Sequence, residues 1–145
     1  MSGDVKLRDV TAKNWRAVAQ LELAPDQRDL VAGNLHSIAE SKFDPDARPR
    51  AVYAGADPVG FLMYDASDDA ALIYRFMIDR RHQGRGYGRA ALILALDEIK
   101  MMRHVRKVSI SYMPDNKIAK AFYGSLGFKE VGVHEDGEMM AELIL

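Results

Sequence analysis

Apolar and polar residues alternate along several short stretches of the chain, as they do in β-strands that bury one face. The first stretch is Val5–Val10, and apolar runs follow at residues 50–54, 59–64 and 70–78. Residues 44–49, which include two prolines, predict a loop, and residues 55–58 predict a turn between two paired strands. Three more strands are expected at residues 107–112, 128–133 and 139–145.

Four other stretches carry apolar residues at helical spacing. Thr11 would cap the first helix, Asp26 the second and Asn116 the last, and the third follows a run of glycines. The residues expected on the four buried faces are Trp15, Val18 and Ala19; Val31, Leu35 and Ile38; Leu92, Ala95, Leu96, Ile99 and Met102; and Ile118, Ala121, Phe122 and Ser125. The resulting order, β-α-α-β-β-β-α-β-α-β-β, predicts a mixed α/β fold in a single domain over residues 1–145.

Bulk composition narrows the classes of function. The chain has 145 residues and a net charge of −1, so we expect no broad electrostatic contact with nucleic acid. It contains no cysteine, which excludes a thiol nucleophile and a disulfide framework and fits a reducing cytoplasm. No apolar run is long enough to span a bilayer, and the four histidines lack ligand spacing, so we expect neither a membrane span nor a metal site.

A glycine-rich segment follows the strand at residues 70–78. Gly84, Gly86 and Gly88 stand at alternate positions just before the third helix, where they leave backbone N–H groups unshielded by a Cβ. A helix N-terminus also carries unpaired N–H donors and a positive partial charge. Together with Arg81, Arg85 and Arg89, these groups predict a site for a dianion such as a pyrophosphate.

Three interpretations of this loop compete. Residues 86–91 fit the dinucleotide fingerprint G-x-G-x-x-A, but the glycines stand too far from the strand end, and the region near Arg106 is basic where that fold needs an acidic residue. A plain turn that caps a surface helix is the second interpretation. In the third, Gln83, Gly86 and Gly88 spell Q/R-x-x-G-x-G/A, which is similar to the acetyl-CoA pyrophosphate loop of the GNAT N-acetyltransferases.

The likeness to this superfamily extends along the chain. Asn116 and residues 121–128 resemble its fourth helix and the step into the next strand. From both motifs and the order of elements, the chain is identified as a member of the GNAT superfamily, whose fold is a mixed, mostly antiparallel central sheet flanked by helices. Shorter matches are most similar to the bacterial spermine/spermidine (diamine) N-acetyltransferases; they are Gln27, Asn34 and Ser37, Arg75–Asp79, Ser111–Asn116 and Gly137–Glu138.

The resemblance implies transfer of acetyl from acetyl-CoA to a primary amine by direct attack through a tetrahedral intermediate. In such enzymes the strand before the glycine loop separates from the strand after the helix, and the thioester lies between them. An N–H near Met77 would polarise the thioester carbonyl. The implied cofactor-binding residues are Phe76, Met77, Ile78, Gln83, Gly84, Arg85, Gly86, Tyr87, Gly88, Arg89, Asn116 and Tyr123.

The resemblance also implies the catalytic groups. Tyr123 matches the tyrosine that protonates the leaving thiolate; without the resemblance, a half-buried tyrosine bonded to a backbone carbonyl would be favoured. Many relatives place a glutamate on the strand before the loop, but residues 70–78 contain none. Glu22 is the first candidate for the general base and Glu138 the second, although either residue by itself is more typical of a solvated carboxylate. Arg75, expected to point opposite Tyr74, is interpreted as structural.

A polyamine such as spermine or spermidine is the leading acceptor that the resemblance implies. A polycation calls for acidic and aromatic groups around its site, and the candidates are Glu22, Tyr74, Tyr112 and Glu138. Two alternatives stay open: acetylation of an antibiotic, an amino acid or a protein amine, and a non-catalytic acyl-CoA-binding sensor. The strand edges near the C-terminus and the apolar end at Leu143–Leu145 could also support a homodimer.

Overall fold

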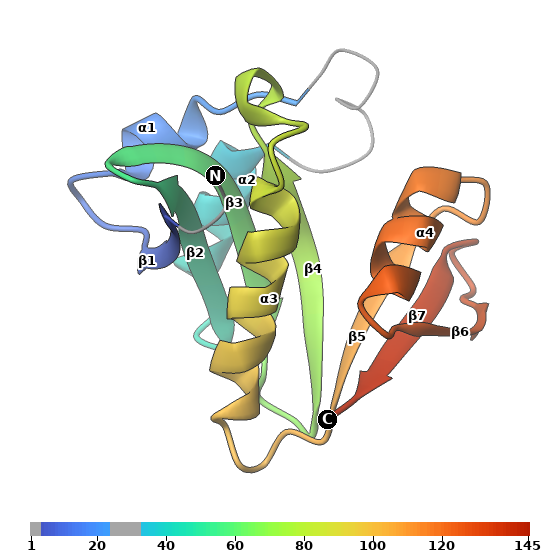
Figure 1. Cartoon of the computed structure of the whole chain (residues 1–145). Helices are drawn as coiled ribbons and strands as arrows, with labels where there is room; N and C mark the ends of the chain where they lie inside the picture. Colours follow the sequence, from blue (N-terminus) through green and yellow to red (C-terminus); the bar gives the residue numbers. More distant parts are fainter. Residues whose placement is uncertain (1–3, 24–32) are drawn as a thin grey trace.

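The computed structural model describes residues 4–23 and 33–145, and its strands and helices follow the predicted order (Figure 1). The elements are β1 (Val5–Asp9), α1 (Trp15–Ala19), α2 (Asn34–Ser41), β2 (Ala47–Ala54), β3 (Asp57–Asp65), β4 (Ala70–Ile78), the short 3₁₀ helix η3 (Arg80–His82), α3 (Tyr87–Lys100), β5 (Lys107–Tyr112), α4 (Lys117–Ser125), β6 (Lys129–Val133) and β7 (Met139–Ile144). The predicted cap Asp26 and the predicted core residue Val31 lie outside the described residues.

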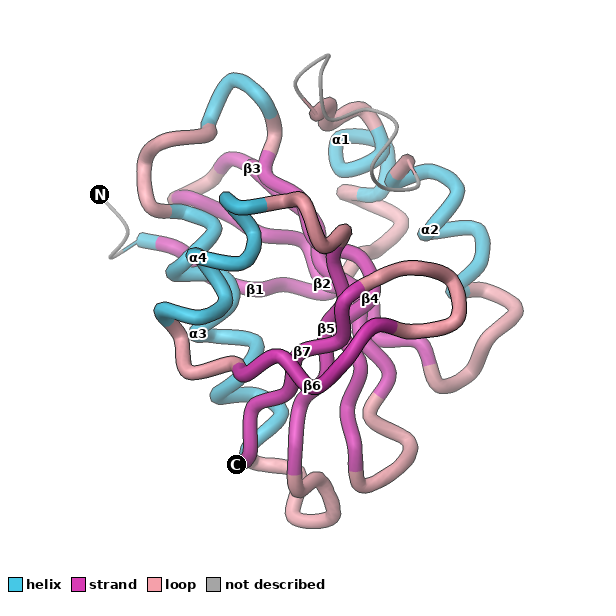
Figure 2. Tube along the Cα trace, turned by 90° about the vertical axis from the view of Figure 1, so that its right-hand side faces the viewer, coloured by secondary structure: helices cyan, strands magenta, loops and turns pink. Residues whose placement is uncertain are grey.

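A single seven-stranded sheet forms the centre of the molecule, in the order β1-β2-β3-β4-β5-β7-β6. Neighbouring strands are antiparallel except β4 and β5, which are parallel. Helices α3 and α4 pack on one face and α1 and α2 on the other (Figure 1, Figure 2). This confirms the mixed, mostly antiparallel sheet flanked by helices.

Strand β3 contributes side chains to the hydrophobic cores on both faces of the sheet. Leu62 and Tyr64 pack in the cluster that contains α3, whereas Phe61 and Met63 pack in the cluster that contains α1 and α2. All four side chains are at most 1% exposed. Because helices cover both faces of the sheet, this strand has a continuous apolar run and does not alternate with polar residues.

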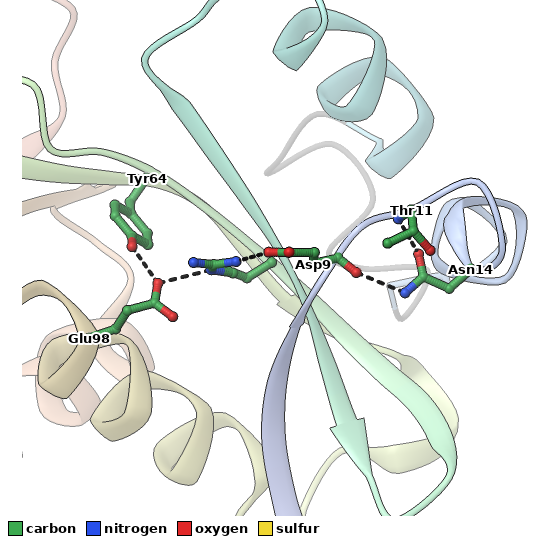
Figure 3. A network of polar contacts seen from close by, with 6 residues as sticks. Asp9, Thr11, Asn14, Tyr64 and Glu98 are labelled. Atoms are coloured by element: carbon green, nitrogen blue, oxygen red, sulfur yellow. Dashed lines mark hydrogen bonds and ion pairs between the residues drawn. The ribbon is translucent and has the colours of Figure 1, made fainter.

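A polar network joins the strands β1, β2 and β3 to the C-terminal half of α3 (Figure 3). Glu98 of α3 accepts hydrogen bonds from Tyr64 Oη and from Arg50 Nε, the latter at 2.9 Å. Arg50 also forms an ion pair with Asp9 of β1. Burial, followed by the hydrogen bond to Glu98, raises the pKa of Tyr64 to about 12. The network therefore fastens α3 at the end remote from the glycine loop.

Two predicted strand boundaries differ from the structure by more than one residue. Strand β2 begins at Ala47, inside the stretch predicted as a loop. Pro49 is tolerated there because it lies beyond Arg50, the last residue of β2 that pairs with β1, so one edge of the strand has no neighbour. Strand β3 begins at Asp57, because the turn is shorter than predicted and relies on Gly55 in the left-handed region, with φ of 62°.

The buried faces of two helices also differ from those predicted. In α2, Ile38 is buried as expected, but Leu35 is 58% exposed and Asn34 takes the inward position. The side-chain amide of Asn34 donates to the carbonyl of Val18 at 2.9 Å and so links α2 to α1. In α4, Ile118 is 85% exposed. The packed side of α4 consists of Ala119, Phe122, Tyr123 and Leu126.

Candidate active site

Strands β4 and β5 separate toward the glycine loop. They pair over three positions only, from Ala70↔Lys107 to Leu72↔Ser109, although β4 continues to Ile78. Figure 1 shows the two strands diverging from this paired end. The predicted separation is confirmed, and over residues 74–78 one edge of β4 faces a gap in the sheet.

The alternation of hydrogen bonds identifies which backbone groups of β4 face β3. The Asp79 N–H donates to the Val59 carbonyl at 2.7 Å, and in antiparallel strands hydrogen-bonded pairs alternate with non-hydrogen-bonded pairs. Met77, two residues before Asp79 and opposite Phe61, therefore belongs to a hydrogen-bonded pair. Its N–H and C=O point toward β3 and away from the gap.

By the same alternation, Phe76 and Ile78 direct their N–H and C=O groups into the gap. The carbonyl of Ile78 accepts a hydrogen bond from Gln83 Nε2 at 2.9 Å, which fastens the glycine loop to the end of the strand. Of the three predicted backbone positions, the structure thus brings Phe76 and Ile78 to the gap. The backbone of Met77 faces the neighbouring strand.

The glycine loop brings an uncapped helix N-terminus to the end of β4. Gly84 and Gly86 have left-handed φ values of 79° and 82°, and Gly86 immediately precedes α3. The first backbone hydrogen bond of the helix runs from the Ala90 N–H to the Gly86 carbonyl at 3.1 Å. The N–H groups of residues 87–89 therefore project from the helix end without an intrahelical acceptor.

The surroundings of this loop fit a diphosphate. A Cβ at Gly84 would meet no atom within 4 Å, so the loop has open space on that side. A Cβ at Gly88 would stand 3.6 Å from Ile78 Cγ1, because the first turn of α3 packs directly on β4. Arg85 and Arg89 are exposed and adjoin these N–H groups in sequence, and Arg89 Nη1 donates to Ser125 Oγ of α4 at 2.8 Å. Free N–H donors and guanidinium groups together are the ligands that phosphate oxygens prefer.

Tyr123 lies on the packed side of α4 within an aromatic cluster. Its ring is nearly parallel to that of Tyr112 at a centroid distance of 5.8 Å and meets Phe122 and Phe128 edge-on at 5.1 and 5.8 Å. Burial raises the pKa of Tyr123 to about 12. No hydrogen-bond partner of its hydroxyl occurs among residues 4–23 and 33–145. The structure therefore presents a protonated phenol that is available as a donor.

Tyr112, a predicted acceptor-binding residue, is buried beside Tyr123. Its hydroxyl donates to Glu130 Oε2 at 2.9 Å, and Glu130 Oε1 lies 3.5 Å from Lys120 Nζ of α4. Burial and this hydrogen bond raise the pKa of Tyr112 to about 12. The contacts link β5, β6 and α4 around the Tyr123 ring. Sequence reasoning missed Glu130, because no local pattern connects it to a tyrosine on another strand.

Asn116 caps α4, as predicted. Its Oδ1 accepts a hydrogen bond from the Ala119 N–H at 3.0 Å. The other polar candidate on this side, Glu138, accepts from Ser111 Oγ at 3.2 Å and so lies against β5. Both residues therefore have structural contacts, and their roles in binding stay predictions.

Glu22 lies at the end of β4, beside the glycine loop. Its backbone N–H donates to Asp79 Oδ1 at 2.8 Å, and its carbonyl accepts from the Arg80 N–H at 2.7 Å. Its side chain forms an exposed ion pair with Arg80 at 3.7 Å. Asp79 was not predicted as a site residue; the available signal was an acidic residue placed directly between an apolar strand and a glycine loop.

A bulge in β4 changes the predicted directions of Tyr74 and Arg75. The pairing with β3 shifts between Met63↔Arg75 and Tyr64↔Ile73, so Tyr74 is an extra residue. Tyr74 packs in the cluster of α1 and α2, and Arg75 reaches the same face. The prediction that these side chains point in opposite directions is wrong, because the bulge interrupts the alternation.

Arg75 has the partners that a half-buried guanidinium needs. Its Nε donates to Ser37 Oγ at 3.2 Å, and its Nη2 lies 3.7 Å from Glu40 Oε2. It also lies 5.2 Å from the centroid of the Tyr74 ring. The Tyr74 hydroxyl, in contrast, is buried without a hydrogen-bond partner in the described part of the chain. Tyr74 therefore remains a candidate for binding a polar ligand on this face.

The described residues contain neither a metal-binding cluster nor a membrane-spanning helix. No group of three or more histidine, cysteine, aspartate or glutamate side chains there is placed to hold a metal ion. No described helix is both long enough and apolar enough to cross a membrane.

The sheet divides beside a glycine loop whose N–H groups fit a dianion, and α4 places Tyr123 against Tyr112 of β5 and Phe122 against Phe76 of β4. This arrangement is typical of CoA-dependent acyltransferases. The profile of the acetyltransferase (GNAT) family matches residues 10–128, and the chain belongs to this family. It is therefore an N-acetyltransferase that uses acetyl-CoA.

Similar proteins cover nearly the whole chain. The spermine/spermidine N(1)-acetyltransferase of Bacillus subtilis (strain 168) is 24% identical over 150 residues, which cover 96% of this chain and 99% of that protein. The crystal structure of spermidine N-acetyltransferase from Vibrio cholerae in complex with CoA and spermine aligns with a TM-score of 0.79 at 17% identity, covering 97% of this chain and 95% of that one. The PaiA N-acetyltransferase of Thermoplasma acidophilum in complex with coenzyme A gives 0.73 at 14% identity, covering 97% and 99%. These structural similarities establish the fold.

Proposed function

We propose that the chain acetylates a primary amine of a small molecule, and that polyamines such as spermine and spermidine are its acceptors. The observation that supports the proposal is the gap between β4 and β5, with the glycine loop at one end and with the Tyr123 ring packed on Tyr112 of β5. The similarity to enzymes named for spermine and spermidine supports the choice of acceptor. A homodimer through the strand edges near the C-terminus and the apolar end at Leu143–Leu145 remains a prediction.

In this proposal the chain holds acetyl-CoA mainly through its backbone. Phe76 and Ile78 offer N–H groups along the gap, and residues 84–89 with the N-terminus of α3 receive the diphosphate. The cosubstrate supplies an activated acetyl group with a thiolate as leaving group. Asn116 contributes a side-chain amide beyond its capping bond. The N–H of Phe76 or Ile78, and not that of Met77, would polarise the thioester carbonyl, because these two face the gap.

Tyr123 is proposed as the proton donor to the departing thiolate. Its pKa of about 12 lies about 3.5 units above that of a thiol, so complete transfer to a free thiolate would be uphill by about 5 kcal/mol. The phenol therefore stabilises the developing charge by a hydrogen bond and delivers its proton as the C–S bond breaks. The absence of a competing partner for its hydroxyl in the described chain favours this role.

The acceptor amine has to lose its proton before it attacks. An alkylammonium group with a pKa of about 10.4 is mostly charged at pH 7, which is a deficit of roughly 4.6 kcal/mol. We propose Glu22 as the base that accepts this proton, directly or through water, and Glu138 and Tyr74 as groups that contact the acceptor. The ion pair of Glu22 with Arg80 is exposed, so it is weak enough to be exchanged for an ammonium group.

The test is a panel of acceptors with acetyl-CoA, in which CoA release is measured with a thiol reagent. Spermidine and spermine should turn over with a higher kcat/KM than an aminoglycoside, free amino acids or a peptide N-terminus. Turnover of one of these alternatives without the polyamines would refute the acceptor and leave the enzyme class intact.

A pair of variants tests the role of Tyr123. Tyr123→Phe should lower kcat by about a hundredfold, the lower end of what general acid catalysis contributes. The affinity for CoA, measured by calorimetry, should change by less than about twofold. Tyr53→Phe serves as the matched control, because it removes a phenol from β2, which pairs with β1 and β3 and does not border the gap. Equal kcat in Tyr123→Phe and wild type would remove Tyr123 from the mechanism.

A further inference from the structure

A buried carboxylate lies where the glycine loop leaves the sheet. Asp79 directly follows β4, and only 1% of its surface is exposed. The proposed chemistry does not use it. A buried carboxylate is tolerated only when it is ionised with good hydrogen bonds or neutralised, so its partners show what holds it in place.

The partners of Asp79 come from two separate segments. On one side, Oδ1 accepts from the backbone N–H of Glu22 at 2.8 Å, across 57 positions of sequence. On the other side, Oδ2 accepts from the Arg81 backbone N–H at 3.3 Å and from Arg81 Nε at 2.9 Å. Asp79 is thus the N-terminal cap of η3 and also the acceptor for the segment that follows α1.

Neighbouring contacts strengthen the link between the two segments. The Arg80 N–H donates to the carbonyl of Glu22 at 2.7 Å, and the side chains of these residues form an ion pair. Glu22 is therefore held at its N–H, its carbonyl and its carboxylate by residues 79–80. Burial alone would raise the pKa of Asp79, but the hydrogen bonds from Glu22 and Arg81 outweigh burial and lower it.

We propose that Asp79 is a positioning residue that fixes the CoA-binding loop and the Glu22 segment in one arrangement. Loss of its charge then weakens two functions together: CoA binding by the loop, and use of the acceptor at Glu22. The inference rests on the proposed function in taking Glu22 as an acceptor-side group and the glycine loop as the site of the CoA diphosphate. A residue that served one half of the site would change one of these quantities alone.

The first experiment compares Asp79→Asn with Asp68→Asn. Asp68 is exposed in the turn between β3 and β4, at the opposite end of β4, so this variant removes the same charge at a remote position. CoA affinity measured by calorimetry should fall about tenfold in Asp79→Asn, a typical size for coupling between sites. In Asp68→Asn it should stay within about twofold. CoA affinity equal to wild type in a folded Asp79→Asn protein would overturn the proposal.

The second experiment follows the acceptor half by steady-state kinetics with spermidine. In Asp79→Asn the KM for spermidine should rise together with the loss of CoA affinity, whereas Glu22→Gln should change spermidine turnover and leave CoA affinity unchanged. Glu22→Gln could leave both kcat and the KM for spermidine unchanged while Asp79→Asn still lowers the affinity for CoA. In that case the proposed role of Glu22 fails, and the effect of Asp79 on the loop stands. An unchanged KM in Asp79→Asn overturns the coupled positioning.

The third experiment needs no variant, so it decides the matter even where Asp79→Asn does not fold. In the wild-type protein, the exchange of the Glu22 amide hydrogen is measured with and without CoA. Because this amide donates to Asp79, binding of CoA to the loop should slow its exchange about tenfold. An exchange rate that CoA leaves unaltered contradicts the link between the two segments.

Discussion

Replacing Gly60 by alanine should displace the strand that borders the gap. Gly60 of β3 lies opposite Ile78 of β4. A Cβ built at this position would stand 2.5 Å from the carbonyl oxygen of Met77, 2.7 Å from Ile78 Cδ1 and 3.3 Å from Val52 Cβ. The first of these atoms is backbone, so no side-chain rotation can relieve the contact. Either β3 or β4 has to shift.

The size of the effect follows from two opposing terms. Overpacking of this kind costs about 1–3 kcal/mol, and alanine in place of glycine within a strand recovers roughly 0.5–1 kcal/mol of chain entropy. Since the contact with Met77 is severe, we expect the upper part of the first range and a net loss of about 2 kcal/mol in the free energy of unfolding. For a chain of this length that corresponds to a fall in Tm of about 8 °C.

The assay combines stability and binding. Urea unfolding and thermal melting measure the loss of stability, and calorimetry measures CoA affinity, which should fall because the neighbouring peptide groups of Phe76 and Ile78 line the gap. Gly124→Ala is the control: its Cβ would meet no atom within 4 Å on α4, so helix propensity should raise stability by about 0.5–1 kcal/mol. A Tm of Gly60→Ala at or above that of wild type would refute the close approach of β3 and β4.

Three further predictions concern single residues. Gly86→Ala should cost about 1–2 kcal/mol of stability by urea unfolding, because Gly86 is left-handed, and should weaken CoA binding. Glu98→Gln should lower the unfolding free energy by about 1.5–3 kcal/mol, because Arg50 and Tyr64 lose an ionised partner. The pKa of Asp79 is lower in the folded chain than in the unfolded chain. Its carboxylate therefore stabilises the fold fully above the unfolded pKa of about 3.9, and this stabilisation is lost as pH falls through the folded pKa. Thermal melting between pH 2 and 6 should show a shallower fall of Tm with acid in Asp79→Asn than in wild type.

Each of these predictions has a contrary outcome. Unchanged CoA affinity in Gly86→Ala would exclude the left-handed turn from cofactor binding. A Glu98→Gln protein as stable as wild type would show that the network in Figure 3 makes no net contribution. Identical acid profiles for wild type and Asp79→Asn would mean that this carboxyl has the same pKa in the folded and unfolded chains.

The cofactor half of the site was predictable because it is encoded locally. Left-handed glycines just before a helix specify a backbone turn within a few residues, and the structure has that turn at Gly84 and Gly86. Periodicity also predicted the long helix after the loop and the strand before it. The residues expected on the buried face of this helix do pack in the hydrophobic core. Local sequence also gave the cap at Asn116.

The acceptor half depends on contacts between distant segments, which the sequence does not display. A bulge at Tyr74 changes the face of the sheet that Arg75 reaches. The extra residue of a bulge cannot be recognised from the sequence when it lies within a run of apolar residues. Asp79 meets Glu22 across 57 positions. Periodicity also placed Ile118 on the wrong side of α4, because this helix packs through its aromatic residues and the spacing alone does not identify that side.

The gap between β4 and β5 indicates the chemistry of the ligand that would fill it. A strand edge in the middle of a sheet leaves N–H and C=O groups without strand partners, and such groups are costly unless another molecule or water pairs with them. Here the edge without a strand partner belongs to Phe76 and Ile78, although the Ile78 carbonyl already accepts a hydrogen bond from Gln83 Nε2. The backbone groups of Met77, by the alternation of pairs, face β3. A ligand that supplies amide groups at strand spacing satisfies this edge in the way that a further strand would. The pantetheine arm of acetyl-CoA carries such amides. In the proposed binding mode they would pair with this edge, and the diphosphate would lie in the glycine loop at the end of the same strand.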